Sequence, residues 1–145
     1  MDNGVDITNQ LQGNIPSNTY TVADRSTTYG FDLNNNGYYE SNNQGQSNSA
    51  AVARVTFTLE TPCLVTFSYI NYAEATYDYG IFGQIDTALG TTYTADSGAY
   101  HTCNASSSNT SAVQTLTYEI SAGTHYIDIK YRKDQMQDDN NDSLQ

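Results

Sequence analysis

Apolar and polar residues alternate along much of the chain with the period of two that is typical of half-buried β-strands. The clearest run is 51–59, where Ala, Val, Phe and Leu at odd positions alternate with a mainly polar set at even positions. In 125–132, one face carries His, Ile and Tyr while the other carries Tyr, Asp, Lys and Arg. Turn residues separate such runs, and we predict strands at 51–59, 63–72, 77–85, 100–103, 116–120, 125–132 and 143–145, with bulges at Gly80 and Gly83.

The spacing and composition of these strands predict an all-β fold. Consecutive strands follow one another every 8 to 15 residues or so, at about the spacing of antiparallel sandwiches, and the abundant Thr, Tyr, Val and Ile favour strands over helices. We therefore predict an antiparallel β-sandwich over residues 20–145, jelly-roll-like and similar to carbohydrate-binding modules. Residues 1–19 keep no period and are interpreted as an N-terminal arm or linker, without the basic region and apolar core of a signal peptide.

The composition decides whether such a fold has enough core. Leu, Ile, Val and Phe supply only 25 of the 145 residues and the formal net charge is -11, which together point towards disorder. The 13 tyrosines change this picture, because tyrosine buries a large ring while its hydroxyl stays hydrated. Sixteen acidic against five basic residues argue against a nucleic-acid partner, and the lack of an apolar run of about 18 residues argues against membrane insertion.

One short pattern is specific enough to suggest a ligand. Residues 32–37 read D-x-N-x-N-G, which is the oxygen-donor spacing of the first half of a calcium loop. The glutamate expected at the twelfth position is missing, so a nearby glutamate and a second acidic loop at 138–142 would have to complete the set. The alternative is a simple hairpin turn, for which Asn36-Gly37 is a strong signal. The candidate calcium ligands are Asp32, Asn34, Asn36, Glu40, Asp139 and Asp142.

Tyrosines also cluster between residues 69 and 79, where Tyr72 and Tyr77 flank Glu74. Exposed tyrosine rings can stack on the apolar face of a pyranose, and a carboxylate can accept hydrogen bonds from its hydroxyls. Tyr72, Glu74 and Tyr77 are therefore the candidate glycan contacts. The alternative is that these rings pack in the sandwich or at a subunit interface, where tyrosine is also enriched.

Signals of catalysis are weak. The sequence holds no nucleophile-elbow, zinc-protease or P-loop motif. His125 falls on the apolar face of its strand, which favours a packed or hydrogen-bonded structural role, and His101-x-Cys103 is a weak metal-ligand pair. Cys63 and Cys103 make at most one disulfide, and the sequence leaves their pairing open.

Five stretches of the sequence carry a resemblance: 37–45 (GYYESNNQG), 70–82 (INYAEATYDYGIF), 85–89 (IDTAL), 122–131 (AGTHYIDIKY) and 140–145 (NNDSLQ). Together they resemble a β-sandwich domain that recurs in tail, fibre and other virion proteins of bacteriophages and of prophages of gut bacteria. The similarity spans residues 29–145 and consists of strings typical of lineage and fold, not of catalytic motifs. It implies a non-enzymatic virion component whose last strand runs on past Gln145.

These observations lead to three hypotheses of function. The first is a phage virion domain of tail or fibre type, located in the virion, which assembles with other virion subunits as a homo-oligomer and contacts host cell-surface glycans. The second is a stand-alone carbohydrate-binding module of a bacterial surface protein or enzyme, stabilised by calcium. The third is a glycan-cleaving enzyme, whose paired carboxylates would come together only in the folded chain.

Overall fold

The computed structural model describes residues 19–25, 28–35, 37–43, 46, 48–72, 79–92, 96, 98–104, 114–133 and 143–144. These residues contain no helix, so none that could cross a membrane, and every strand pair is antiparallel. The predicted all-β class is thereby confirmed. The strands are β1 (Thr19–Asp24), β2 (Phe31–Leu33), β3 (Tyr39–Ser41), β4 (Ser49–Leu59), β5 (Cys63–Tyr69), β6 (Asn71–Tyr72), β7 (Tyr79–Gly83), β8 (Ala99–Asn104), β9 (Gln114–Ile120), β10 (Gly123–Lys133) and β11 (Ser143–Leu144).

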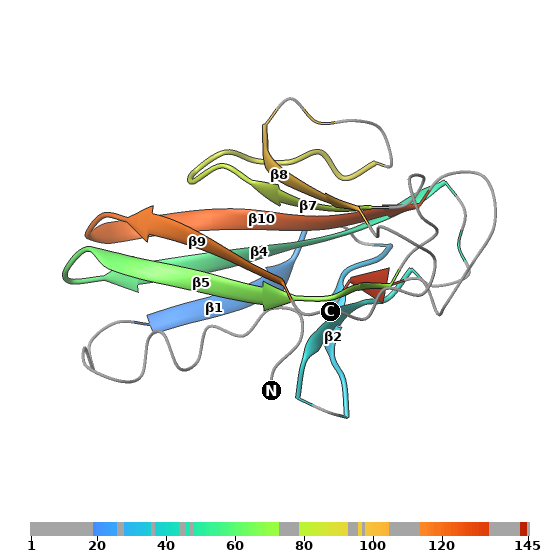
Figure 1. The fold of residues 1–145 in the computed structure, drawn as a ribbon, viewed down its shortest axis with the longest axis horizontal. Helices are drawn as coiled ribbons and strands as arrows, with labels where there is room; N and C mark the ends of the chain where they lie inside the picture. The colour runs from blue at the N-terminus through green and yellow to red at the C-terminus, as the bar shows by residue number, and fades with distance from the viewer. Residues whose placement is uncertain are drawn as a thin grey trace.

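The largest sheet has the order β1-β4-β10-β7-β8, and β5 pairs with β9 in a second sheet. In Figure 1 the long strands β4 and β10 run through the middle of the molecule, and the β5–β9 pair lies across them. Two short pairs, β2–β3 and β6–β11, complete the described part of the fold. The chain crosses between the two main sheets at 60–62 and at 121–122, which places both crossings at the same end of the sandwich.

The core lies between the five-stranded sheet and the β5–β9 pair, which makes the fold sandwich-like. Alternation along β4 sends its odd residues inward, as predicted, and the register sets Val55 opposite Ile127 and Phe57 opposite His125. Three tyrosines, Tyr69, Tyr118 and Tyr131, are almost completely buried in this core, so the expectation that tyrosine supplements the scarce aliphatic residues is confirmed. The Phe67 ring packs edge-on against Phe57 and Tyr118.

The predicted strand pattern needs three adjustments. Strands β1, β2 and β3 all precede residue 51 and are not among the predicted strands. The predicted strand 63–72 is two strands, because the chain leaves the β9 ladder after Tyr69 and pairs with β11. In β7, Phe82 and not Ile81 faces the core, while Ile81 is buried on the opposite face of the sheet. The sequence pattern predicted Ile81 and Ile85 on one face, but β7 ends at Gly83, so its alternation does not extend to Ile85.

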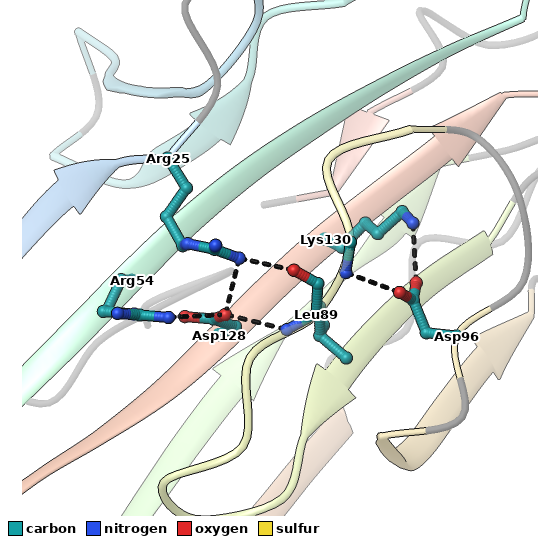
Figure 2. Close-up of polar contacts among 7 residues, drawn as sticks. Arg25, Arg54, Leu89, Asp96, Asp128 and Lys130 are labelled. Atoms are coloured by element: carbon teal, nitrogen blue, oxygen red, sulfur yellow. Dashed lines mark hydrogen bonds and ion pairs between the residues drawn. The ribbon is translucent and has the colours of Figure 1, made fainter.

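The outer face of the large sheet is not a simple solvent-facing surface. The segment between β7 and β8 folds over β10, so Asp128 and Lys130 are fully buried although the sequence pattern sets them opposite the apolar core (Figure 2). We call this region the covered face. Asp128 accepts hydrogen bonds from Arg25 Nη1 (2.9 Å), Arg54 Nε (2.7 Å) and the Leu89 N–H (2.9 Å). A buried carboxylate is tolerated when it is paired and hydrogen-bonded in this way.

The same segment is fixed at a second point. Lys130 Nζ donates to Asp96 Oδ2 (2.6 Å), and the Gly90 N–H donates to Asp96 Oδ1 (2.5 Å), as Figure 2 shows. Arg54 also lies 3.7 Å above the centre of the Tyr126 ring, and its hydrogen bond to Asp128 raises the pKa of its guanidinium. On the covered face, Asp128 is therefore paired with Arg25 and Arg54, and Lys130 with Asp96.

Candidate functional site

A groove of about 780 Å³ opens between β8, β9 and the turn that follows β7. Tyr100 of β8 stands over it with 55% of its surface exposed, and its ring lies 5.1 Å from the buried ring of Tyr118. We call this hollow the Tyr100 groove. An aromatic ring supported from behind and open in front is well suited to stacking on a flat ligand surface. The groove is lined by Gln84, Ile85, Tyr100, Thr117, Tyr118 and Glu119.

A β-bulge accounts for the position of Tyr100. In the β7–β8 ladder Phe82 is opposite His101, whereas Gly83 is opposite Ala99, so Tyr100 is the one extra residue of β8. Bulges redirect a side chain out of the regular alternation and are common beside functional sites. The predicted bulge at Gly83 is confirmed, although the added residue belongs to the partner strand, and Gly80 pairs regularly.

The opposite wall of the groove is a tight turn at 84–87. The Thr87 N–H donates to the Gln84 carbonyl (3.1 Å), and Asp86 has a φ of 59°, a left-handed conformation that aspartate tolerates better than most residues. Its backbone N–H donates to the Tyr126 carbonyl (2.9 Å). The turn is thus tied to β10, which keeps Gln84 and Ile85 in place along the groove.

A histidine–aspartate pair strengthens this tie. His125 Nδ1 lies 2.6 Å from Asp86 Oδ2, and the Tyr126 N–H donates to Asp86 Oδ1 (2.9 Å). The hydrogen bond to Asp86 raises the pKa of His125, with help from the Ala122 carbonyl. Burial alone would raise the pKa of Asp86, but the hydrogen bonds from His125 and Tyr126 outweigh it, and the pKa lies below its ordinary value. We call this pair the latch.

The latch superficially resembles a hydrolytic triad, because Ser121 Oγ lies 3.1 Å from His125 Nε2. The Ala122 carbonyl oxygen is at the same distance from Nε2. The Ala122 carbonyl can accept a hydrogen bond only from a protonated Nε2, and the Asp86 carboxylate only from a protonated Nδ1. Both contacts are satisfied when the ring carries two protons, as the imidazolium. An imidazolium has no lone pair to take a proton from Ser121. The arrangement therefore favours the structural role predicted for His125 over nucleophilic catalysis.

The glycan contacts predicted from the sequence are not visible as a site. Glu74 and Tyr77 lie outside the described residues. Tyr72 belongs to β6, where its backbone pairs with Ser143, and its side chain is also outside the described part. The role of all three as glycan contacts stays a prediction.

The hairpin turn predicted at Asn36-Gly37 is confirmed by the pairing of β2 with β3. The Asn34 N–H donates to the Tyr38 carbonyl (2.7 Å), and Gly37 has a φ of 86°, as in a three-residue hairpin loop with glycine in the left-handed position.

The calcium hypothesis concerns the same hairpin. Asp32 and Glu40 are cross-strand partners beside a hollow of about 360 Å³, and the amides of Asn42 and Asn34 donate to their carboxylates at 3.0 and 3.4 Å. Strand β11 lies next to β3, which brings the end of the chain to this hairpin. Within the described residues no group of three or more His, Cys, Asp or Glu side chains is placed to hold a metal. Asn36, Asp139 and Asp142 lie outside those residues, and the calcium site stays a prediction.

The weak metal pair at His101 and Cys103 has a different local role. His101 Nε2 hydrogen-bonds with the Tyr69 hydroxyl (2.9 Å), and the two rings pack edge-on. Cys63 begins β5 opposite Ile120, whereas Cys103 lies in β8 opposite Gly80, and the Cys103 side chain is outside the described part. The pairing of Cys63 with Cys103 in a disulfide therefore stays open.

Tyr100, Gln84 and Glu119 are not singled out as site residues by the sequence pattern. Glu119 was visible as one of four glutamates and as an outward residue of its strand. Tyr100 looked like an ordinary strand residue, since alternation does not reveal a bulge. The groove also joins segments about 15 and 35 residues apart, as tertiary sites do. Comparison of the chain with protein-family models, with curated proteins and with solved structures gives no match.

Proposed function

We propose that the chain is a non-enzymatic glycan-binding domain of a phage virion, and that the Tyr100 groove is its binding site. The observation that carries the proposal is the bulge at Tyr100, which turns an aromatic ring towards solvent on the support of Tyr118. Gln84, Thr117 and Glu119 surround the ring with an amide, a hydroxyl and a carboxylate. The aromatic ring can stack on the apolar face of a pyranose, and the polar groups around it can hydrogen-bond with the sugar hydroxyls.

The virion setting rests on the resemblance of residues 29–145 to phage and prophage sandwich domains. In this proposal the sandwich is jelly-roll-like, the protein assembles with other virion subunits as a homo-oligomer, and the groove meets glycans on the host cell surface. A surface with few charges and many Asn, Ser, Thr and Tyr residues fits a protein that lies against other surfaces. The imidazolium state favoured for His125 supports a binding role over a hydrolytic one.

The experiment is a glycan array followed by titration calorimetry on the best ligand. Tyr100→Ala should weaken binding at least tenfold, because stacking on a supported ring is lost, while Tyr100→Phe should keep most of the affinity. Leu33→Ala is the matched control, since Leu33 is also a large exposed side chain, 62% accessible, but lies on the β2–β3 hairpin. Binding unaffected by Tyr100→Ala would reject the groove, and a chain that binds no glycan would reject the function.

The stand-alone carbohydrate-binding module shares this groove and differs in assembly. Light scattering separates the two: the virion proposal expects a concentration-dependent oligomer of the full chain, whereas a module would remain monomeric at the highest concentration tested.

A further inference from the structure

We infer that the Tyr100 groove selects glycans built from uncharged pyranose units and rejects acidic ones. The inference rests on the proposed function and adds the class of ligand. It follows from the placement of the charged groups that the structure describes around the groove, starting with the Lys and Arg residues. The imidazolium of His125, beside the groove wall, is paired with Asp86 at 2.6 Å.

The chain has only five Lys and Arg residues, and all of them lie in the described part of the structure. None lines the Tyr100 groove. They lie instead directly after β1, on β4 and on β10: Arg25, Arg54, Lys130, Arg132 and Lys133.

Three of these cations are already committed to carboxylates. Arg25 and Arg54 contact Asp128 at 2.9 and 2.7 Å, and Lys130 contacts Asp96 at 2.6 Å with its side chain fully buried. Lys133 is also fully buried, at the end of β10, and Arg132 lies opposite Tyr79, at the end of β7 away from Gly83 and the groove. A sugar carboxylate, sulfate or phosphate in the groove would therefore find no guanidinium or ammonium group to replace its hydration.

The groove itself carries the opposite charge. Glu119 is exposed, and it is the one formally charged side chain among the six that line the groove. The neighbouring hollow of about 480 Å³ at Pro62, Leu64 and Ser121 also includes Glu119 and adds no other ionised group. With a net charge of -11 on the whole chain, an anionic glycan is repelled during approach as well as in the groove.

The same groups are suited to an uncharged sugar. The Glu119 carboxylate accepts hydrogen bonds from hydroxyls, and the Gln84 amide both donates and accepts. The Thr117 hydroxyl already hydrogen-bonds with the Thr66 hydroxyl (2.8 Å) and has further capacity as an acceptor. The Tyr100 ring stacks on C–H bonds and needs no charge on its partner. Tyr100 therefore supplies affinity, and Glu119 decides which glycans are admitted.

The test uses matched pairs of oligosaccharides: neutral hexose oligomers, and the same chains with the C6 hydroxymethyl groups oxidised to carboxylates. Binding is measured with the full chain in chelator, so that a bridging metal ion cannot join two anions. We expect the neutral member of each bound pair to bind about tenfold more tightly at low salt. The ratio should shrink as ionic strength rises, because Glu119 is exposed.

Two variants separate the roles of the ring and the carboxylate. Glu119→Lys should bring the acidic oligomer to equal or tighter binding than its neutral partner, and Glu119→Gln should lower the ratio part of the way. Tyr100→Ala should weaken both members alike. Tighter binding of acidic oligomers by the unaltered protein, or a ratio unchanged in Glu119→Lys, would overturn the charge selection while leaving glycan binding intact. Failure of both members of every pair to bind would overturn the proposed function itself.

Discussion

The covered face and the Tyr100 groove share the segment between β7 and β8, whose middle covers β10 and whose two ends lead into the groove, but their polar groups differ in exposure. On the covered face, Asp128 and Lys130 are sealed from water and each has close charged partners. In the groove, Gln84, Thr117 and Glu119 are exposed. The charges of the covered face are thus buried and paired, whereas the polar side chains of the groove are exposed, and of these the Thr117 hydroxyl also hydrogen-bonds with Thr66 (2.8 Å). The proposed function therefore rests on exposed polar groups beside an aromatic ring and not on the number of charges.

The largest effect should come from removing the centre of the covered face. Asp128→Ala leaves Arg25 and Arg54 without their shared carboxylate and should lower the free energy of unfolding by about 3 to 5 kcal/mol. Urea denaturation measures this. Glu119→Ala is the matched control in the groove and should change stability by less than about 0.5 kcal/mol, since its carboxylate is exposed. Similar effects of the two substitutions would erase the distinction between the regions. Asp128→Asn, which keeps part of the hydrogen bonding, serves if the alanine variant does not fold.

A smaller difference in stability is expected between substitutions at Tyr118 and Tyr100, whose rings are in contact. The buried Tyr118 hydroxyl donates to the Gly83 carbonyl at 2.8 Å. Tyr118→Phe leaves that carbonyl without this donor and should lower the free energy of unfolding by about 1 to 2 kcal/mol. Tyr100→Phe, on the exposed ring stacked against it, should have almost no effect. A reversed order in thermal and urea melts would show that Tyr100 serves the fold.

The latch between His125 and Asp86 predicts a pH dependence of stability. The pKa of His125 is raised in the folded protein, so its contribution is complete below its unfolded value of about 6.5 and is lost as the pH rises through the folded value. The pKa of Asp86 is lowered, so its contribution is present above about 3.9 and is lost as the pH falls through the folded value.

The latch should therefore stabilise the groove wall most between about pH 4 and pH 6.5. The measurement is the difference in melting temperature between the unaltered protein and His125→Asn across this range, which removes the background titration of the other carboxylates. Asp86→Asn should abolish most of that difference. A difference that stays constant above neutral pH would contradict the latch.

The smallest effect is expected at the β2–β3 hairpin, outside both regions. Asp32 and Glu40 are opposite like charges, so Asp32→Asn in chelator should raise the free energy of unfolding by about 0.5 kcal/mol. If the hairpin holds calcium as predicted, added calcium should raise the melting temperature of the unaltered protein more than that of the variant. Equal melting temperatures with calcium and with chelator would reject the site.

The sequence pattern predicted the strands well because burial on one face of a strand is written into every second residue. The runs that became β4 and β10 show this, and so does the hairpin at Gly37. The pattern could not show that the polar face of β10 would be buried, since this depends on Leu89 and Asp96, which belong to the segment between β7 and β8 and not to β10 itself. It missed the groove for a related reason: Tyr100 and Glu119 meet only after the two sheets pack.

The bulge in β8 makes the site depend on length as much as on side-chain identity. Ala99 and His101 pair with adjacent residues of β7, so one residue removed between them would restore an even ladder. A related chain could then retain Gln84, Thr117 and Glu119 and yet have no ring over the groove. Under the proposed function, a single-codon insertion or deletion in β8 would therefore be enough to gain or lose ligand binding, and a comparison of substitutions alone would not reveal the change.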